Sequence, residues 1–186
     1  MIGYAFCGSF CTFSESFIQF SALCRAGYDV QPIMSENAYT KDTRFFKAED
    51  FRRMVTEEAG REIIHTIEDA EPFGHVNRLD ALIISPCTGN TLAKIATGIT
   101  DTAVTMAAKA HLRCDGPLLI ALCSNDAMSQ NLSNISTLLQ RKSVYFLPMR
   151  QDNPIGKPHS LVADMTKLFD ALLAMKNGEQ IRPIFI

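Results

Sequence analysis

D-A-L-I-I-S-P-C-T-G-N-T-L-A-K-I-A-T-G-I-T-D-T-A-V-T-M-A-A-K-A-H-L-R, residues 80–113, is the stretch that decides the fold. Residues 81–84 are a short, uninterrupted apolar run, which is typical of a parallel strand buried on both faces. Pro86 cannot extend a strand ladder, and Gly89 permits a sharp turn. We therefore expect a strand that ends in a turn.

A helix is expected to follow this strand. Thr88, Asn90 and Thr91 are residues that cap helix N-termini, and Gly98 predicts the stop. A second helix follows, capped by Asp101 or Thr102. A strand that ends in a polar turn at a helix N-terminus can bind an anion, because free N–H groups and the helix dipole point toward it. An ordinary well-capped turn would show the same residues, and both interpretations stay open here.

The same pattern recurs along the chain. Further strands are expected at residues 2–7, 28–34, 118–123 and 143–147, with a shorter one at 63–67. Further helices are expected from Ser14 to about residue 24, over 49–59, over about 129–139, and from Ser160 through residue 172. This alternation predicts an α/β fold with a doubly wound parallel sheet, a Rossmann-like or flavodoxin-like three-layer sandwich. Residues 37–50 and 148–158 are interpreted as surface loops, and the apolar tail 181–186 is expected to dock.

Length and composition predict one domain over residues 1–186. The chain is 47% hydrophobic and 20% charged, which suits a well-filled core. Its net charge of −2 gives no electrostatic basis for binding nucleic acid or acidic membranes. No apolar run approaches the roughly 18 residues of a membrane span. The start, M-I-G-Y-A-F, does not resemble a signal peptide. We therefore expect a cytoplasmic location.

Polar residues follow each predicted strand where it ends. Because the carboxyl ends of parallel strands meet at one edge of a sheet, these residues should gather there. They offer hydroxyl, amide and backbone N–H groups with little fixed charge, which suits a phosphate and a heterocycle. The candidate binding residues are Gly8, Ser9, Ser35, Thr88, Gly89, Asn90, Thr91, Ser124 and Asn125. Basic residues near this edge are few and lie on loops: Lys41, Arg44, Arg150 and Lys157.

Two reactive side chains are candidates for catalytic groups. Cys87 lies in the candidate turn, but a nucleophilic cysteine needs a nearby base, and buried cysteine usually acts as a small apolar residue. His75 could be an acid–base group, although a solvated loop histidine is the favoured interpretation. The six cysteines form no C-x-x-C pair, and the chain shows no metal-ligating motif and no dinucleotide fingerprint.

Residues 85–102, S-P-C-T-G-N-T-L-A-K-I-A-T-G-I-T-D-T, resemble the P-A-S-A-N-T…K-I-A-N-G-I-A-D-N motif of the homo-oligomeric flavin-containing cysteine decarboxylase superfamily. The resemblance implies FMN held at a subunit interface of a trimer or dodecamer. His75-Val76 stands where the decarboxylases carry their catalytic His-Ile pair, and residues 124–128 resemble their P-x-M-N-x-x-M segment. Phe10 stands where FMN-binding relatives often have serine, so it joins the candidate cofactor residues.

Within this superfamily, the B subunits of dipicolinate synthases are similar over nearly the whole chain. The segments that carry this resemblance include C-G-S-F-C-T-F at 7–13, Q-D-N-P-I-G-K-P-H-S-L-V-A at 151–163 and R-P-I-F-I at 182–186. The resemblance implies an oxidoreductase component that acts with the A subunit of dipicolinate synthase to form dipicolinate from dihydrodipicolinate during sporulation. The A subunit is expected to bring NADP, and this chain FMN.

Two other functions stay open. One is a flavin-free scaffold that assembles or activates the A subunit. The other is an FMN-dependent decarboxylase, which is disfavoured because Thr88-Gly89 replaces Ser-Ala of the motif and Thr102 replaces its asparagine. By the same resemblance we expect a homotrimer or a multiple of it. The predicted helix over 102–112 is small and apolar around much of its circumference, which would suit packing against another copy.

Overall fold

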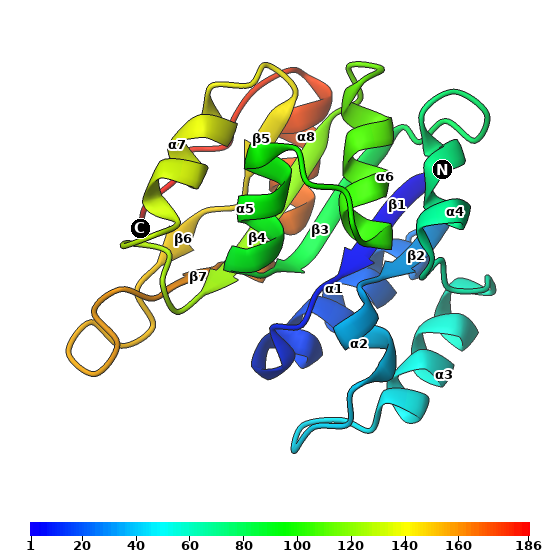
Figure 1. Ribbon diagram of the computed structural model, residues 1–186, viewed down its shortest axis with the longest axis horizontal. Coiled ribbons are helices and arrows are strands. Elements are labelled where there is room, and N and C mark those ends of the chain that lie inside the picture. Colours follow the sequence, from blue (N-terminus) through cyan, green and yellow to red (C-terminus); the bar gives the residue numbers. More distant parts are fainter.

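The computed structural model describes all of residues 1–186 and contains one seven-stranded sheet (Figure 1). The strands are β1 (Ile2–Phe6), β2 (Val30–Met34), β3 (Ala81–Cys87), β4 (Leu118–Ser124), β5 (Val144–Phe146), β6 (Met149–Arg150) and β7 (Leu161–Ala163). Their order is β2-β1-β3-β4-β7-β6, and β5 also pairs with β4. The strands β1 to β5 pair in parallel, whereas β7 is antiparallel to both β4 and β6. The predicted doubly wound fold is confirmed, with an antiparallel extension at one edge.

Helices cover both faces of the sheet. They are α1 (Phe13–Arg25), α2 (Glu36–Thr40), α3 (Ala48–Ala59), α4 (Ile67–Ala70), α5 (Gly89–Thr97), α6 (Ala103–Leu112), α7 (Leu132–Leu139) and α8 (Leu168–Lys176), with 3-10 turns η1 (Phe10–Thr12), η2 (Glu71–Phe73) and η3 (Met165–Lys167). One apolar core lies between the sheet and α1, α3 and α8. A second core lies between the sheet and α4, α5, α6 and α7, so the molecule has three layers.

The central strands read as unbroken apolar runs because each of their two faces lies in a core. In β3, Ala81 and Ile83 face the α1 side, whereas Leu82 and Ile84 face the α6 side. All four side chains are at most 1% exposed. A strand with one solvated face would alternate apolar and polar residues instead.

The prediction for the last helix is wrong at its start. Residues 161–163 are strand β7, and Asp164 follows, accepting a hydrogen bond from the Thr166 amide at 3.1 Å. The α-helix starts only at Leu168. Leu161, Met165 and Leu168 have helical spacing, but Leu161 is instead buried against the end of β4. Pairing with a strand distant in the sequence thus overrides the local helical pattern.

Smaller boundary predictions are also wrong. Residues 63–67 form no strand and contribute a single bridge, between Ile64 and Ile33. The helix predicted from Ser14 starts at Phe13, with Thr12 at the N-cap position. The segment 37–50 is not all loop, because α2 covers residues 36–40. The first and last residues of the other predicted strands and helices shift by a few positions.

Hydrogen-bond partners outside the sheet border its outer strands β2, β5 and β6. Along β2, the amide of Met34 donates to the carbonyl of Ile64 at 2.9 Å. Along β5, the side-chain amide of Gln180 bonds both the N–H and the carbonyl of Phe146, at 2.8 and 2.7 Å. Beside β6, the amide of Met149 donates to the carbonyl of Ile184 at 2.7 Å, which confirms that the apolar tail docks.

The helix α6 owes its apolar circumference to packing within the chain. Val104, Ala107 and Ala108 have no exposed surface, because α6 lies between the sheet, α4 and η2. The surface that this helix was expected to offer to a second copy is therefore already covered. Its composition gives no argument for self-association, and the oligomer expectation keeps only its basis in family resemblance.

Candidate functional site

A cavity of about 790 Å³ opens beyond the carboxyl ends of β1, β3 and β4. It lies where ligands bind in open α/β sheets. The loops that follow β2 and β6 also reach it. The structure brings these predicted residues together in its wall: Gly8, Ser9, Phe10, Thr88, Gly89, Asn90, Ser124 and Asn125.

The side chains of two other predicted residues, Ser35 and Thr91, serve the helices instead. Neither lines the cavity. The hydroxyl of Ser35 accepts a hydrogen bond from the Ala38 amide at 3.3 Å and caps α2. Thr91 is 8% exposed, and its hydroxyl accepts a bond from the Thr88 hydroxyl at 3.1 Å. Good capping residues and good ligand donors are chemically alike, so the sequence could not separate them.

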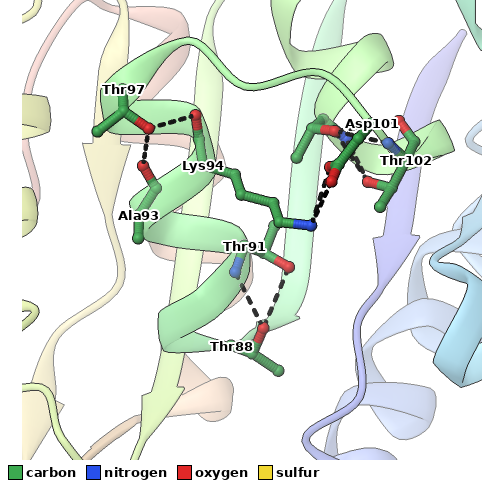
Figure 2. Close-up of polar contacts among 8 residues, drawn as sticks. Thr88, Thr91, Ala93, Lys94, Thr97, Asp101 and Thr102 are labelled. Carbon is green, nitrogen blue, oxygen red and sulfur yellow. Dashed lines mark hydrogen bonds and ion pairs between the residues drawn. The ribbon is translucent and has the colours of Figure 1, made fainter.

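The N-terminus of α5 forms one wall of the cavity. The Thr88 hydroxyl accepts a bond from the Thr91 amide at 3.2 Å, which caps the helix (Figure 2). The first-turn amides of Gly89 and Asn90 have no acceptor within the helix, as at any helix start. At the other end of α5, Lys94 bonds both carboxylate oxygens of Asp101, at 2.9 and 2.8 Å, and this pairing lowers the pKa of Asp101. The ion pair ties α5 to the start of α6 (Figure 2).

A polar cluster of Ser124, Asp126 and Asn131 packs against Gly89. The Asp126 carboxylate accepts hydrogen bonds from the Ser124 hydroxyl and from the Asn131 amide, the second at 2.9 Å. A Cβ atom on Gly89 would lie 2.7 Å from the Asp126 Oδ1 and 2.5 Å from the Asn131 Nδ2. Glycine is thus required here by close approach. The sequence marks Asp126 only as part of a motif and does not reveal its place in the wall.

Loop residues supply the fixed charge of the cavity. Arg44 and Lys157 line it, whereas Lys41 and Arg150 do not. Lys157 pairs with Asp152, another wall residue, at 3.0 Å, and this hydrogen bond lowers the pKa of Asp152. The Arg44 guanidinium lies over the Phe45 ring, 4.8 Å from its centroid. Sequence analysis could have found these loop residues only by their basic or aromatic character, because no periodicity in the sequence encodes the path of a loop.

His75 and Cys87 do not join the cavity as reactive groups. His75 is exposed and precedes β3, so it lies at the opposite end of that strand, on the order of 20 Å away. Its Nδ1 atom accepts a bond from Arg113 at 3.1 Å. The Cys87 thiol is fully buried, and burial raises its pKa well above the usual value. A thiol held in that form is not the nucleophilic thiolate.

The wall chemistry is therefore that of a binding site. Hydroxyls, amides and one free arginine can hold a phosphate and polar ring edges, while Phe10 and Phe45 offer apolar contact. No group of three or more His, Cys, Asp or Glu side chains is arranged to hold a metal ion. None of the helices has the length and apolar character needed to cross a membrane.

Comparison with known proteins gives the family. Residues 2–176 match the Flavoprotein family. The B subunit of dipicolinate synthase from Bacillus subtilis (strain 168) is 35% identical over 185 residues, which cover 100% of this chain and 92% of that protein. The crystal structure of the dipicolinate synthase B subunit from Bacillus halodurans C superposes with a TM-score of 0.91 at 37% identity, covering 100% of this chain and 95% of the other.

More distant structures share the fold. A dodecameric FMN-dependent UbiX-like decarboxylase from Escherichia coli O157:H7 superposes with a TM-score of 0.63 at 22% identity, over 80% of both chains. At this identity the likeness concerns architecture alone. The chain therefore belongs to the Flavoprotein family, and within that family it resembles the B subunit of dipicolinate synthase along its full length.

Proposed function

We propose that the chain is the B subunit of a dipicolinate synthase, which binds FMN in the cavity and acts with the companion A subunit to form dipicolinate from dihydrodipicolinate during sporulation. The observation that carries the proposal is the full-length similarity to the Bacillus subtilis B subunit, at 35% identity. The cavity supports it as well, since its wall includes residues that the sequence marked for a phosphate and a heterocycle: Gly8, Ser9, Thr88, Gly89, Asn90, Ser124 and Asn125.

The cavity suits FMN in size and in chemistry. Its volume of about 790 Å³ lies within the usual range for small-molecule sites, roughly 300–1,000 Å³. Gly8 and Ser9 would hold the phosphate, with Arg44 as the counter-charge. Thr88, Asn90, Ser124 and Asn125 would bond the sugar-alcohol chain and the ring edges. Bound FMN would supply the capacity to accept or deliver a hydride.

Within a single chain, His75 lies too far from the cavity to act on a ligand bound there. The length of β3 separates it from the cavity. A decarboxylase that used this histidine would need a second copy of the chain to bring it beside the bound flavin. Dihydrodipicolinate oxidation also needs an electron acceptor, and NADP is assigned to the companion A subunit because this chain has no dinucleotide fingerprint.

A flavin-free scaffold is the second candidate, and two observations favour it. Phe10 lines the cavity where FMN-binding relatives often have serine, so one phosphate contact is replaced by a ring. The Thr88 and Thr91 hydroxyls also bond each other, which leaves fewer groups for a ligand. In this role the chain would assemble or activate the companion A subunit.

Two measurements test the proposal. A visible spectrum of the purified protein, after incubation with FMN and gel filtration, should show flavin absorption at about 450 nm, whereas a flavin-free scaffold would emerge colourless. Dihydrodipicolinate and NADP are then incubated with both proteins together and with each omitted. Dipicolinate should form at full rate only with both. Equal turnover by the companion protein alone, or product from this chain alone, would refute the joint reaction.

A further inference from the structure

The fixed charges of the cavity are unevenly distributed. Four charged side chains line it, and Lys157 and Asp152 neutralise each other across 3.0 Å. Arg44 and Asp126 remain, and neither takes part in an ion pair. One positive and one negative group are therefore free to act on a ligand.

These two groups lie toward opposite sides of the cavity. Arg44 belongs to the segment after β2, and Asp126 to the segment after β4. In the sheet, β1 and β3 stand between those strands. Three strand spacings of about 4.8 Å separate β2 from β4 by about 14 Å. The strand order thus points to a cationic end of the cavity on the β2 side and an anionic end on the β4 side.

Hydrogen bonds fix the anionic end in place. Asp126 accepts from the Ser124 hydroxyl and from Asn131, a residue that is only 4% exposed. Asn131 is itself positioned, because its side-chain oxygen accepts a bond from Asn134 at 3.0 Å. The carboxylate is held beside Gly89, the first residue of α5, where it complements the positive end of the helix dipole. The position that a ligand phosphate would take at this helix is filled by the protein's own anion.

We propose that Asp126 sets the direction in which the ligand binds. The anionic group of a mononucleotide lies at the Arg44 end, and a hydroxyl or ring N–H of its uncharged part donates to Asp126. The reverse direction brings phosphate against a carboxylate in a partly enclosed site, where like charges repel strongly. The inference rests on the proposed FMN site and adds to it a residue that selects ligands with one charged and one donor-bearing end.

The test compares FMN with riboflavin, which carries the same ring and sugar-alcohol chain without the phosphate. Dissociation constants for both are measured by flavin fluorescence on the full chain. Arg44→Gln should weaken FMN binding by roughly tenfold to a hundredfold and change the affinity for riboflavin by less than about twofold. Asp126→Asn should weaken both ligands by the same factor, about tenfold or more, because it removes a charged acceptor that both ligands use.

Matched controls change the same charges outside the cavity. Lys41→Gln removes a cation from the loop that carries Arg44, and Asp115→Asn removes an exposed carboxylate that precedes β4, at the end of the sheet away from the cavity. Asp115 has a positive φ of 56°, which asparagine tolerates. Both controls should bind both flavins like the wild type. If a control variant changes the dissociation constants as much as the matching cavity variant does, the effect comes from net charge alone and the inference is overturned.

Other outcomes separate the inference from the proposed function. If Asp126→Asn strengthens the binding of FMN but not that of riboflavin, the phosphate lies at α5 and the inference is wrong. If the affinity for both flavins is unchanged, Asp126 does not contact the ligand. Arg44 lies on an exposed loop, so the FMN-to-riboflavin ratio of Arg44→Gln tests the direction even if Asp126→Asn folds poorly. An unchanged ratio in that variant overturns the inference. Failure of the wild type to bind either flavin would overturn the FMN site itself.

Discussion

Gly89→Ala tests whether the polar cluster sets the shape of the cavity. Gly89 lies in α5 and has no positive φ, so its backbone alone would accept alanine. Alanine would even stabilise a helix by up to about 1 kcal/mol relative to glycine. The added Cβ, however, would meet Asp126 at 2.7 Å and Asn131 at 2.5 Å. Contacts this short force the cluster to move.

The cost follows from the bonds that must break. Moving the Asp126 carboxylate loses at least one hydrogen bond to a charged group, about 1.5–3 kcal/mol, against a helical gain of up to about 1 kcal/mol. We expect Gly89→Ala to lower the free energy of unfolding by about 1–2 kcal/mol. Urea-induced unfolding followed by circular dichroism measures this difference.

A double-mutant cycle identifies the cause. In a background with Asp126→Ala and Asn131→Ala, the contacts are gone and only the Ser124 hydroxyl remains, which can rotate away. There Gly89→Ala should be neutral or stabilising, by up to about 1 kcal/mol. Equal destabilisation in both backgrounds would refute the assignment to the cluster, and so would a stabilising effect in the wild type.

Three further predictions follow from the same structure. Thr88→Ala combined with Asn90→Ala should weaken FMN binding about a hundredfold or more in a fluorescence titration. Thr97→Ala, which loses only a hydroxyl bonded to the carbonyls of Ala93 and Lys94 in the same helix (Figure 2), should bind FMN normally. Unchanged FMN affinity in the double variant would locate the site elsewhere. Burial lowers the pKa of His111, so as the pH falls the His111 imidazole of the unfolded chain is protonated before that of the folded chain. The free energy of unfolding should therefore fall as the pH drops below about 6.5. His111→Gln should flatten this part of the pH–stability curve, and an unchanged slope would contradict the role of His111. Light scattering should give a trimer or a multiple of it, and a monomer at micromolar concentration would contradict the proposed assembly.

The strands that sequence analysis predicted well are those whose residues are buried on both faces. Ala81–Ile84 and Leu118–Cys123 are unbroken apolar runs. Sequence analysis did not predict strand β7, because three residues are too few to establish a periodicity and because its partner Cys123 lies far away in the sequence. The short helix α2 escaped for the same reason of length, although its cap, Ser35, is among the polar residues that the sequence marks.

The site was partly predictable for a topological reason. Parallel strands bring their carboxyl ends to one edge, so residues 8–10, 88–90 and 124–125 had to converge once the strands were placed. The residues that add charge could not be found this way. Arg44, Asp152 and Lys157 reach the cavity only through the paths of loops, and Asp126 needed the knowledge that Gly89 packs against it.

The bordered edges of the sheet restrict how this protein can join a partner. A strand added from another chain needs a free row of amides and carbonyls. On one side Pro32 offers no N–H, and residues 62–64 already bond that edge. On the other side Gln180 and the tail occupy the groups of Phe146 and Met149. Protein partners should therefore meet this chain through helices and loops. A chain cut before Gln180 would uncover the edges at β5 and β6 and become prone to edge-to-edge aggregation.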